Sequence, residues 1–180
     1  MVLPVVAGLL FLNGSKVENH KNNAFDDGVN WMTWEEVQKM QQKSPRKVFV
    51  DVYTHWCGWC KKMDASTFKN KYVVKYLNDN YYSIKFNAET KEPIVFKGQK
   101  FEYVASGRRG YNELAAELLN GRLSYPTTLF MDENLNLLTV VPGYQNAKDL
   151  DAILNFFGGD NYKSVDWAGF QQSYKSPISN

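Results

Sequence analysis

The sequence predicts an α/β fold in which helices cover both faces of a mixed central sheet. Helical and strand patterns follow each other in the order helix, strand, helix, strand, insert, helix, strand, strand, helix. Residues 48–53, VFVDVY, form an almost unbroken run of strand-forming residues, as in a strand covered on both faces. The chain has 180 residues, 44% of them hydrophobic, which is enough for one full core and short for two.

Cap and turn residues set the limits of the elements. Thr33 can cap the first helix, with Glu35 and Glu36 in its first turn, and Ser44-Pro45 ends it. The remaining expected elements are the strand 48–53, a helix from Cys57 to about Phe68, a second turn or helix to Asn80, a strand 82–86, a hairpin turning near Gly98, a helix capped by Asn112, strands 127–131 and 135–141, and a helix 147–157.

The two ends of the chain differ from its middle. Residues 2–12 are apolar but too few to cross a bilayer, which takes about 20 residues, and their length suits the core of a signal peptide. We therefore expect a signal peptide over residues 1–14 and a periplasmic or secreted protein; a buried segment of a cytoplasmic protein is the alternative. Residues 15–30 are expected to be a polar linker, 31–157 the main domain and 158–180 an extension that docks on it.

The charge balance argues against nucleic acid as a partner. Lys and Arg number 21 and Asp and Glu number 19, so the formal net charge is +2. The sequence contains no long basic tract that would neutralise a phosphate backbone. Nucleic acid is therefore not an expected partner.

The chain has only two cysteines, Cys57 and Cys60, in the run C-G-W-C. Structural disulfides of exported proteins usually come as several long-range pairs, so a single close pair indicates one that cycles between reduced and oxidised forms. At the N-terminus of a helix, Cys57 would face free backbone N–H groups that favour a thiolate, and it is the expected nucleophile. Cys60 would lie one turn deeper on the same helix face and is the expected resolving thiol.

A zinc site and an inert cysteine pair are the alternatives for this motif. A structural zinc ion needs four ligands, and beyond the cysteines the chain offers only His20 and His55. Because His20 lies in the polar linker, we expect no metal site. His55 is expected to be a solvated loop residue, although its protonated form would stabilise a thiolate two residues away.

Asp51 interrupts the apolar run 48–53, where a carboxylate is costly without a partner or a task. By strand alternation it shares a face with Phe49 and Tyr53, below the cysteines. Burial would raise its pKa and make it a proton acceptor for Cys60; a solvated position at a strand end is the alternative. Lys85, in the neighbouring strand, is either its charge partner or a surface lysine.

Aromatic residues near the cysteines are expected to contact the substrate. Trp56 and Trp59 flank Cys57 and offer apolar surface to a peptide or an unfolded chain. Tyr125-Pro126 lies just before a predicted strand, where an X-Pro bond can be cis although the base rate favours trans.

Four segments, VDVYTHWCGWCKKM, IKFNAE, SYPTTLF and VVPGY, resemble the thioredoxin family. The resemblance covers about residues 33–157 and is interrupted by an insert at 91–110, before the helix that precedes Pro126. The sequence most resembles exported thioredoxin-like proteins of the Bacteroidetes type that carry C-G-W-C-K-K-M. The resemblance implies a thioredoxin-like fold, a buried acid at Asp51, a lysine near it at Lys85, a substrate-contacting cis-proline at Pro126 with Tyr125 before it, and a glycine after the last hairpin at Gly143.

Two features depart from the family. Trp59 replaces the usual proline between the cysteines, which leaves the direction of the redox reaction open. The insert, with Arg108 and Arg109, has no counterpart in plain thioredoxin. It would either recognise a partner or cover a sheet edge.

The resemblance implies a thiol–disulfide oxidoreductase that reduces or exchanges disulfides in exported proteins. A disulfide-forming oxidant and a non-catalytic binding module on the same fold are the alternatives. The expected partners are proteins with disulfides or thiols and an electron-donor protein. The disulfide between Cys57 and Cys60 would be the redox group, with no other cofactor, and we expect no stable membrane insertion after processing.

Overall fold

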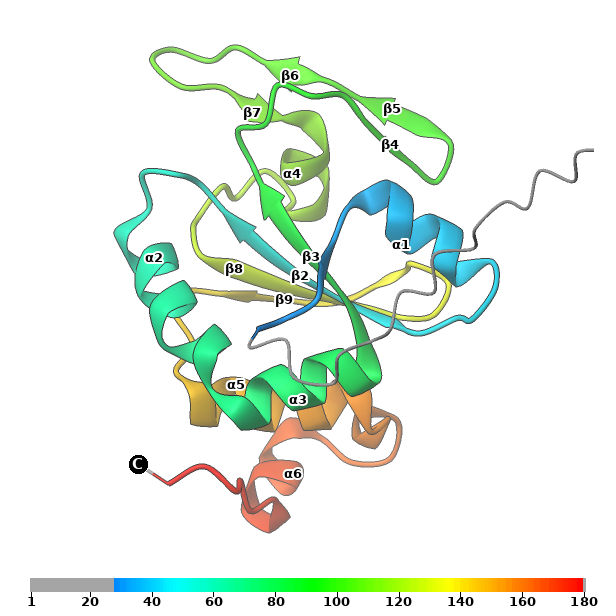
Figure 1. The fold of residues 1–180 in the computed structure, drawn as a ribbon, viewed down its shortest axis with the longest axis vertical. Helices are drawn as coiled ribbons and strands as arrows, with labels where there is room; N and C mark the ends of the chain where they lie inside the picture. The colour runs from blue at the N-terminus through cyan, green and yellow to red at the C-terminus, as the bar shows by residue number, and fades with distance from the viewer. Residues whose placement is uncertain (1–27, 180) are drawn as a thin grey trace, which may run out of the picture.

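The computed structural model describes residues 28–179, and a five-stranded sheet lies at its centre (Figure 1). The strand order is β1-β3-β2-β8-β9; β1, β3 and β2 are parallel, whereas β8 and β9 run antiparallel to their neighbours. The strands are β1 Trp31–Met32, β2 Lys47–Tyr53, β3 Tyr81–Asn87, β8 Thr127–Met131 and β9 Leu137–Pro142. The predicted mixed sheet is therefore confirmed, with the addition of β1, which no pattern in the sequence predicts.

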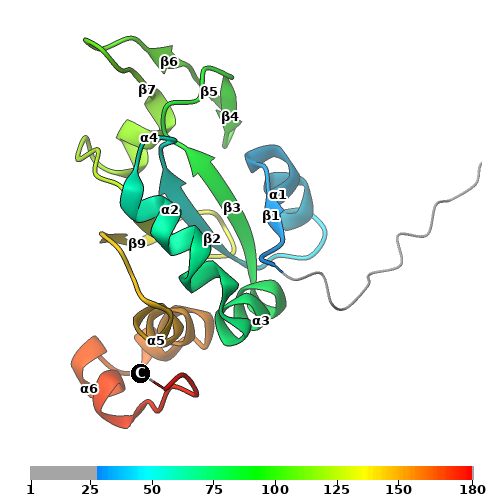
Figure 2. The same ribbon diagram turned by 60° about the vertical axis from the view of Figure 1, so that its left-hand side comes forward.

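Helices cover both faces of this sheet, as predicted. Helices α1 and α4 pack on one face and α2, α3 and α5 on the other, and Figure 2 shows α1 and α2 on opposite sides of β2 and β3. The bounds are α1 Trp34–Gln41, α2 Gly58–Ala65, α3 Lys71–Asn80, α4 Glu113–Leu118 and α5 Ala147–Gly158. None of the helices within residues 28–179 is long and apolar enough to cross a membrane.

Strand β2 is buried on both faces and divides the core into two clusters. Val48, Val50 and Val52 belong to the cluster under α1 and α4, whereas Phe49 belongs to the cluster under α2, α3 and α5. Because side chains alternate along a strand, Asp51 points to the same face as Phe49. The sequence of β2 therefore sets a single carboxylate beneath α2.

Two element limits, the end of the cysteine helix and the beginning of the last strand, differ from the prediction by more than one residue. The helix expected to reach Phe68 ends at Ala65 and is followed by a 3-10 turn, Thr67–Lys69, where the Thr67 hydroxyl donates to the carbonyl of Gln145 at 2.7 Å. The strand expected to begin at Leu135 begins at Leu137, because the Asp132 carboxylate accepts the backbone N–H groups of Asn134 and Asn136 and extends the turn.

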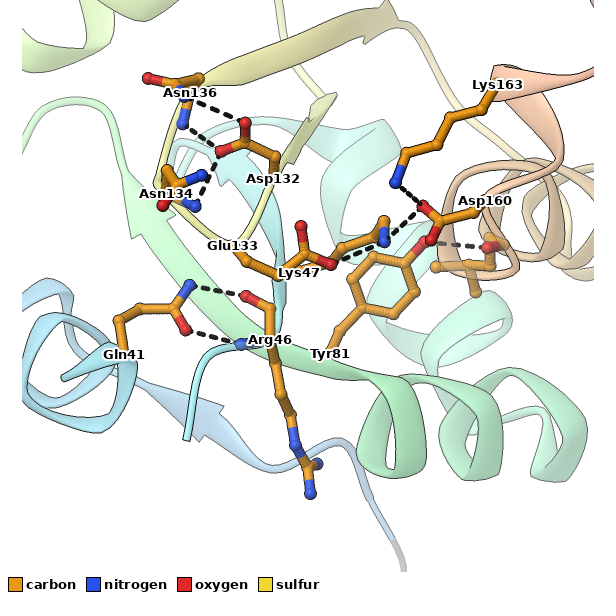
Figure 3. Close-up of polar contacts among 11 residues, drawn as sticks. Gln41, Arg46, Lys47, Tyr81, Asp132, Glu133, Asn134, Asn136, Asp160 and Lys163 are labelled. Atoms are coloured by element: carbon orange, nitrogen blue, oxygen red, sulfur yellow. Dashed lines mark hydrogen bonds and ion pairs between the residues drawn. The ribbon is translucent and has the colours of Figure 1, made fainter. Parts of the chain in front are cut away.

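A buried lysine fixes the beginning of β2, at the end of the strand opposite to the cysteines (Figure 3). The Lys47 ammonium lies 2.8 Å from a carboxylate oxygen of Glu133 and 2.7 Å from one of Asp160. Burial lowers the pKa of Lys47, but these two carboxylates outweigh it and hold the pKa above its usual value. The β8–β9 turn and the end of α5 are thereby tied to the central strand.

The insert forms two small two-stranded sheets, β4 with β5 and β6 with β7. Its strands are β4 Ile94–Phe96, β5 Gln99–Phe101, β6 Tyr103–Val104 and β7 Tyr111–Asn112. The predicted hairpin turns at Lys97 and Gly98, both with positive φ. Phe96 and Phe101 are buried in the cluster around Trp34 of α1, so the insert is packed against the main domain.

The chain after α5 packs back onto that helix. It contains a 3-10 turn, Asn161–Lys163, and α6, Trp167–Ser173. The rings of Trp167 and Phe170 lie 5.2 and 5.1 Å from the ring of Phe156 in α5. At the other end of the chain, the expected signal peptide and most of the expected linker lie outside the described residues, whereas Val29, near the end of that linker, is buried in the core.

Candidate active site

Cys57 and Cys60 form a disulfide at the beginning of α2. Figure 1 shows where the chain passes from β2 into this helix. Cys57 is the N-cap of α2, and its sulfur accepts the backbone N–H of Cys60 at 3.1 Å. The free N–H groups and the positive end of the helix dipole stabilise negative charge at this position. The reduced form of the pair therefore has a site for a thiolate at Cys57.

Both cysteine residues of the disulfide are buried, Cys60 slightly more than Cys57. Cys57 is 5% exposed and Cys60 is 2% exposed, whereas the adjacent Trp56 and Trp59 are 49% and 56% exposed. A partner that reaches the disulfide must therefore contact the tryptophans. Cys57 precedes the first turn of α2 as its N-cap, and Cys60 lies in that turn, among the buried residues of the helix.

Asp51 is 1% exposed and lies opposite Lys85 in the parallel register of β2 and β3. One of its carboxylate oxygens accepts a hydrogen bond from the Lys85 ammonium at 2.5 Å, and the other has no partner within the described residues. Burial raises the pKa of Asp51 to about 6, although the charge of Lys85 opposes the rise. Asp51 can therefore hold or release a proton near neutral pH.

Lys85 is shared between two carboxylates, because its ammonium also donates to Asp64 on α2. Burial lowers the pKa of Lys85, but Asp51 and Asp64 outweigh it, so the pKa stays above its usual value. The rings of Trp31, Tyr53 and Phe68 surround the ammonium at 5.0 to 5.1 Å from their centroids.

Asp64 is a site residue that no pattern in the sequence predicts. It lies four residues after Cys60, which places both on one face of α2, toward β2 and β3. Its side chain is 43% exposed, whereas that of Lys85 is 19% and that of Asp51 1%. The three groups form a continuous polar chain from the buried strand to the surface.

Tyr125 contacts Trp56, the residue before Cys57, and the peptide bond between Tyr125 and Pro126 is cis. The rings of Tyr125 and Trp56 are nearly perpendicular, with their centroids 6.0 Å apart, and the Trp56 indole N–H donates to Glu89 at 2.9 Å. The carbonyl of Pro126 accepts the N–H of Gly143 at 2.8 Å, and Gly143 has a φ of 90°, in the region that favours glycine.

Trp59 contacts a different set of residues from Trp56. Its ring lies 5.3 Å from that of Tyr144, and the Lys62 ammonium sits over both rings, at 4.6 and 5.1 Å from their centroids. Neither contact is predicted by the sequence. Trp56, Trp59, Tyr125 and Tyr144 together form an aromatic rim around the disulfide.

His55 is exposed and packs edge-on against Tyr53 at 5.5 Å. Within residues 28–179 no group of three or more His, Cys, Asp or Glu side chains is arranged to hold a metal ion.

Asp51→Asn is expected to stabilise the oxidised protein more at pH 8 than at pH 4. The pKa of Asp51 is about 6 in the folded protein and near 4 in the unfolded chain, so the folded protein binds this proton more tightly. Proton binding at Asp51 therefore stabilises the folded wild type fully below about pH 4, and this stabilisation is lost as the pH rises through about 6. A shift of this size corresponds to about 3 kcal/mol in the free energy of unfolding. Urea unfolding of both proteins from pH 4 to 8 measures the difference; a constant difference contradicts the assignment.

Asp64→Asn is expected to lower the pKa of Asp51 below about 6. The charge of Asp64 contributes to the raised pKa of Asp51, and its loss also leaves the Lys85 ammonium to Asp51 alone. The carbon-13 shift of the Asp51 carboxyl as a function of pH gives the pKa directly. Asp64→Glu is the matched control that keeps the charge, and an unchanged or higher pKa in Asp64→Asn would refute the coupling.

Comparison with known proteins places this arrangement in a family. The model of a family described as a thioredoxin-like domain matches residues 34–158. Two solved structures show the same fold. A thioredoxin-fold protein from Helicobacter pylori superposes with a TM-score of 0.55 at 18% identity, covering 72% of this chain and 81% of that one. A protein from Bacteroides thetaiotaomicron, proposed to be a disulphide isomerase, superposes with a TM-score of 0.54 at 22% identity, covering 78% and 98%.

Among curated proteins, the uncharacterized protein B0495.5 of Caenorhabditis elegans is 29% identical over 93 residues, which is 51% of this chain. The matched part is only 12% of that protein, so this chain corresponds to a small portion of that relative. The family match, in contrast, extends from the first residue of α1 to the last residue of α5. The chain belongs to the thioredoxin-like domain family.

Proposed function

We propose that the protein is a thiol–disulfide oxidoreductase that reduces or exchanges disulfides in other proteins through Cys57 and Cys60. The observation that carries the proposal is the disulfide at the N-terminus of α2, on the sheet face where Asp51 is buried. A helix N-terminus stabilises a nucleophilic thiolate, and a buried carboxylate with a pKa of about 6 can take up a proton.

The first step is attack of the reduced Cys57 thiolate on a substrate disulfide. A bond forms between Cys57 and one substrate sulfur, and the other substrate sulfur leaves as a thiolate that takes a proton from solvent. The N–H of Cys60, which points at the Cys57 sulfur, stabilises the charge on that sulfur before attack.

In the second step Cys60 attacks the Cys57 sulfur and releases the second substrate thiolate. Cys60 must lose its proton first, and Asp51 is the proposed acceptor because it lies on the buried side of α2 with one free carboxylate oxygen. The protein ends as the Cys57–Cys60 disulfide, having passed two electrons to the substrate. A donor dithiol protein must then reduce it for the next cycle.

The aromatic rim and the Tyr125–Pro126 loop are the proposed substrate contacts. Trp56 and Trp59 are about half exposed, so they can bury apolar side chains of a bound segment. Tyr125 is held against Trp56, and Gly143 supports the Pro126 backbone by its hydrogen bond.

The comparisons support a redox function of this kind without fixing its direction. The B. thetaiotaomicron protein is proposed to act on disulfides, and a second structural neighbour, with a TM-score of 0.52 at 14% identity, is named DsbH oxidoreductase. We propose a periplasmic or secreted setting on the basis of the apolar segment 2–12. Sequencing the N-terminus of the protein recovered from its own cells tests this, since an intact residue 1 would exclude cleavage.

The wild-type protein is expected to accelerate the reduction of insulin by dithiothreitol. Cys57→Ser should bring the rate down to the uncatalysed level, because no nucleophile remains. Cys60→Ser should accumulate a mixed disulfide at Cys57 that is visible by mass spectrometry, because the resolving thiol is absent. If the wild type and Cys57→Ser reduce insulin equally, the cysteine pair is a static disulfide and the fold serves as a binding module.

The reduction potential of the pair is expected between roughly −270 and −180 mV, the range of reducing and exchanging enzymes. The buried carboxylate of Asp51 disfavours negative charge beneath the sulfurs, and Trp59 adds no charge between them. Equilibration with glutathione buffers measures the potential. A value near about −120 mV, shifted downward by His55→Ala, would instead establish a disulfide-forming oxidant.

A further inference from the structure

We infer that the loop Ser106–Gly110 of the insert forms a cationic wall of the substrate site and selects protein segments that carry an Asp or Glu beside the reacting cysteine. The inference rests on the proposed function and names a property of its substrate. Its central residue is Arg109, which lies 52 positions after Cys57 in the sequence.

Arg109 is stacked on the tryptophan next to the nucleophile. Its guanidinium carbon lies 4.1 Å from the centroid of the Trp56 ring. In Figures 1 and 2 the β6–β7 loop projects on the side where the chain passes from β2 into α2. Trp56 is itself held by Tyr125 and Glu89, so Arg109 rests on a fixed surface.

The shape of the loop is set by two glycines. The Arg109 N–H donates to the Ser106 carbonyl at 3.1 Å across a tight turn in which Gly107 has a φ of 56°. At Gly110 a Cβ would lie 2.2 Å from the Val104 carbonyl oxygen, so only glycine allows the two strands to approach. The turn at Ser106–Arg109 and the close approach at Gly110 therefore place Arg109 at the end of the β6–β7 connection.

The base of the insert is joined to the strand that leads to the cysteines. The N–H of Asn112 in β7 donates to the Ala88 carbonyl at 2.7 Å, and the N–H of Ala88 donates to the Tyr53 carbonyl at 2.9 Å. Tyr53 is the last residue of β2. Together with the buried Phe96 and Phe101, these bonds fix the insert relative to the disulfide.

The charges at the rim are arranged to receive a carboxylate. Arg109 covers Trp56 and Lys62 covers Trp59, and within residues 28–179 neither cation has a carboxylate within 4.0 Å. A stacked guanidinium keeps the N–H groups at its edge available for a bidentate bond to Asp or Glu. Glu89 is the acidic side chain that contacts the rim, and its carboxylate already accepts the indole N–H of Trp56.

An insert that only covered a sheet edge would not require these features. Arg108 and Arg109 are both exposed, and next to Lys62 the exposed Lys61 adds another positive charge. An extended segment crossing the disulfide between the two tryptophans passes both cations. Arg109 is therefore a specificity-determining residue that acts on binding and leaves the sulfur chemistry to Cys57 and Cys60.

The test is the reduction of three matched disulfide peptides with Asp, Asn or Lys beside the cysteine. The wild type is expected to show kcat/KM in the order Asp, Asn, Lys, with about two- to fivefold between neighbours, mainly through KM and decreasing with salt. Arg109→Gln should abolish most of this preference, and Arg109→Lys should retain part of it. Lys71→Gln is the matched control: it removes an exposed cation that lies over the Tyr72 ring of α3, and it should keep the preference.

Equal kcat/KM for the three peptides with the wild type, or an undiminished preference in Arg109→Gln, would overturn the inference. Failure to reduce any peptide would contradict the proposed function instead. In that event the same peptides with serine in place of cysteine are titrated against the oxidised protein, with tryptophan fluorescence as the readout. Tighter binding of the Asp peptide that is lost in Arg109→Gln supports the cationic wall, and equal binding overturns it.

Discussion

The burial of a carboxylate, Asp51, in the central strand is the constraint on which the arrangement of the residues around it depends. A carboxylate in the middle of a buried strand would destabilise the fold without a partner, and only the parallel register of β2 and β3 places the lysine opposite to it. The Lys85 ammonium is also paired with Asp64 of α2, and three aromatic rings surround it. The positions of β2, β3 and α2 are thus linked by one charge, and α2 carries the cysteines.

The two faces of the sheet have different roles in the proposed reaction. The face under α2 holds the carboxylate that can accept a proton, away from solvent. The insert packs on the opposite face, against Trp34 of α1, yet its loop reaches around to Trp56. In the proposed reaction, proton transfer and substrate recognition would therefore use separate parts of the chain, and changes in the insert would alter specificity without disturbing the buried carboxylate.

Local patterns predict the central strand and the beginnings of the first helix and of the cysteine helix, and they favour burial of Asp51, with a solvated strand end as the alternative. The run 48–53 has strand character on both faces, and the capping box of Thr33 with Glu36 is complete within four residues. Asp64 contacts Lys85, 21 positions later, and Arg109 contacts Trp56, 53 positions earlier. No local pattern specifies either contact. The early end of α2 has a similar cause, because Thr67 turns to bond the carbonyl of Gln145, 78 residues away.

The sulfur of Cys57 is at once the proposed nucleophile and the N-cap of α2. Every change in its bonding, from thiolate to mixed disulfide to internal disulfide, therefore changes how well the first turn of the helix is capped. By thermodynamic linkage, the redox form that caps the turn better is stabilised by the folding of the helix. A partner that unfolds this turn would therefore shift the equilibrium between the reduced and the oxidised cysteine pair. The stability of the first turn of α2 therefore contributes to the reduction potential of the cysteine pair.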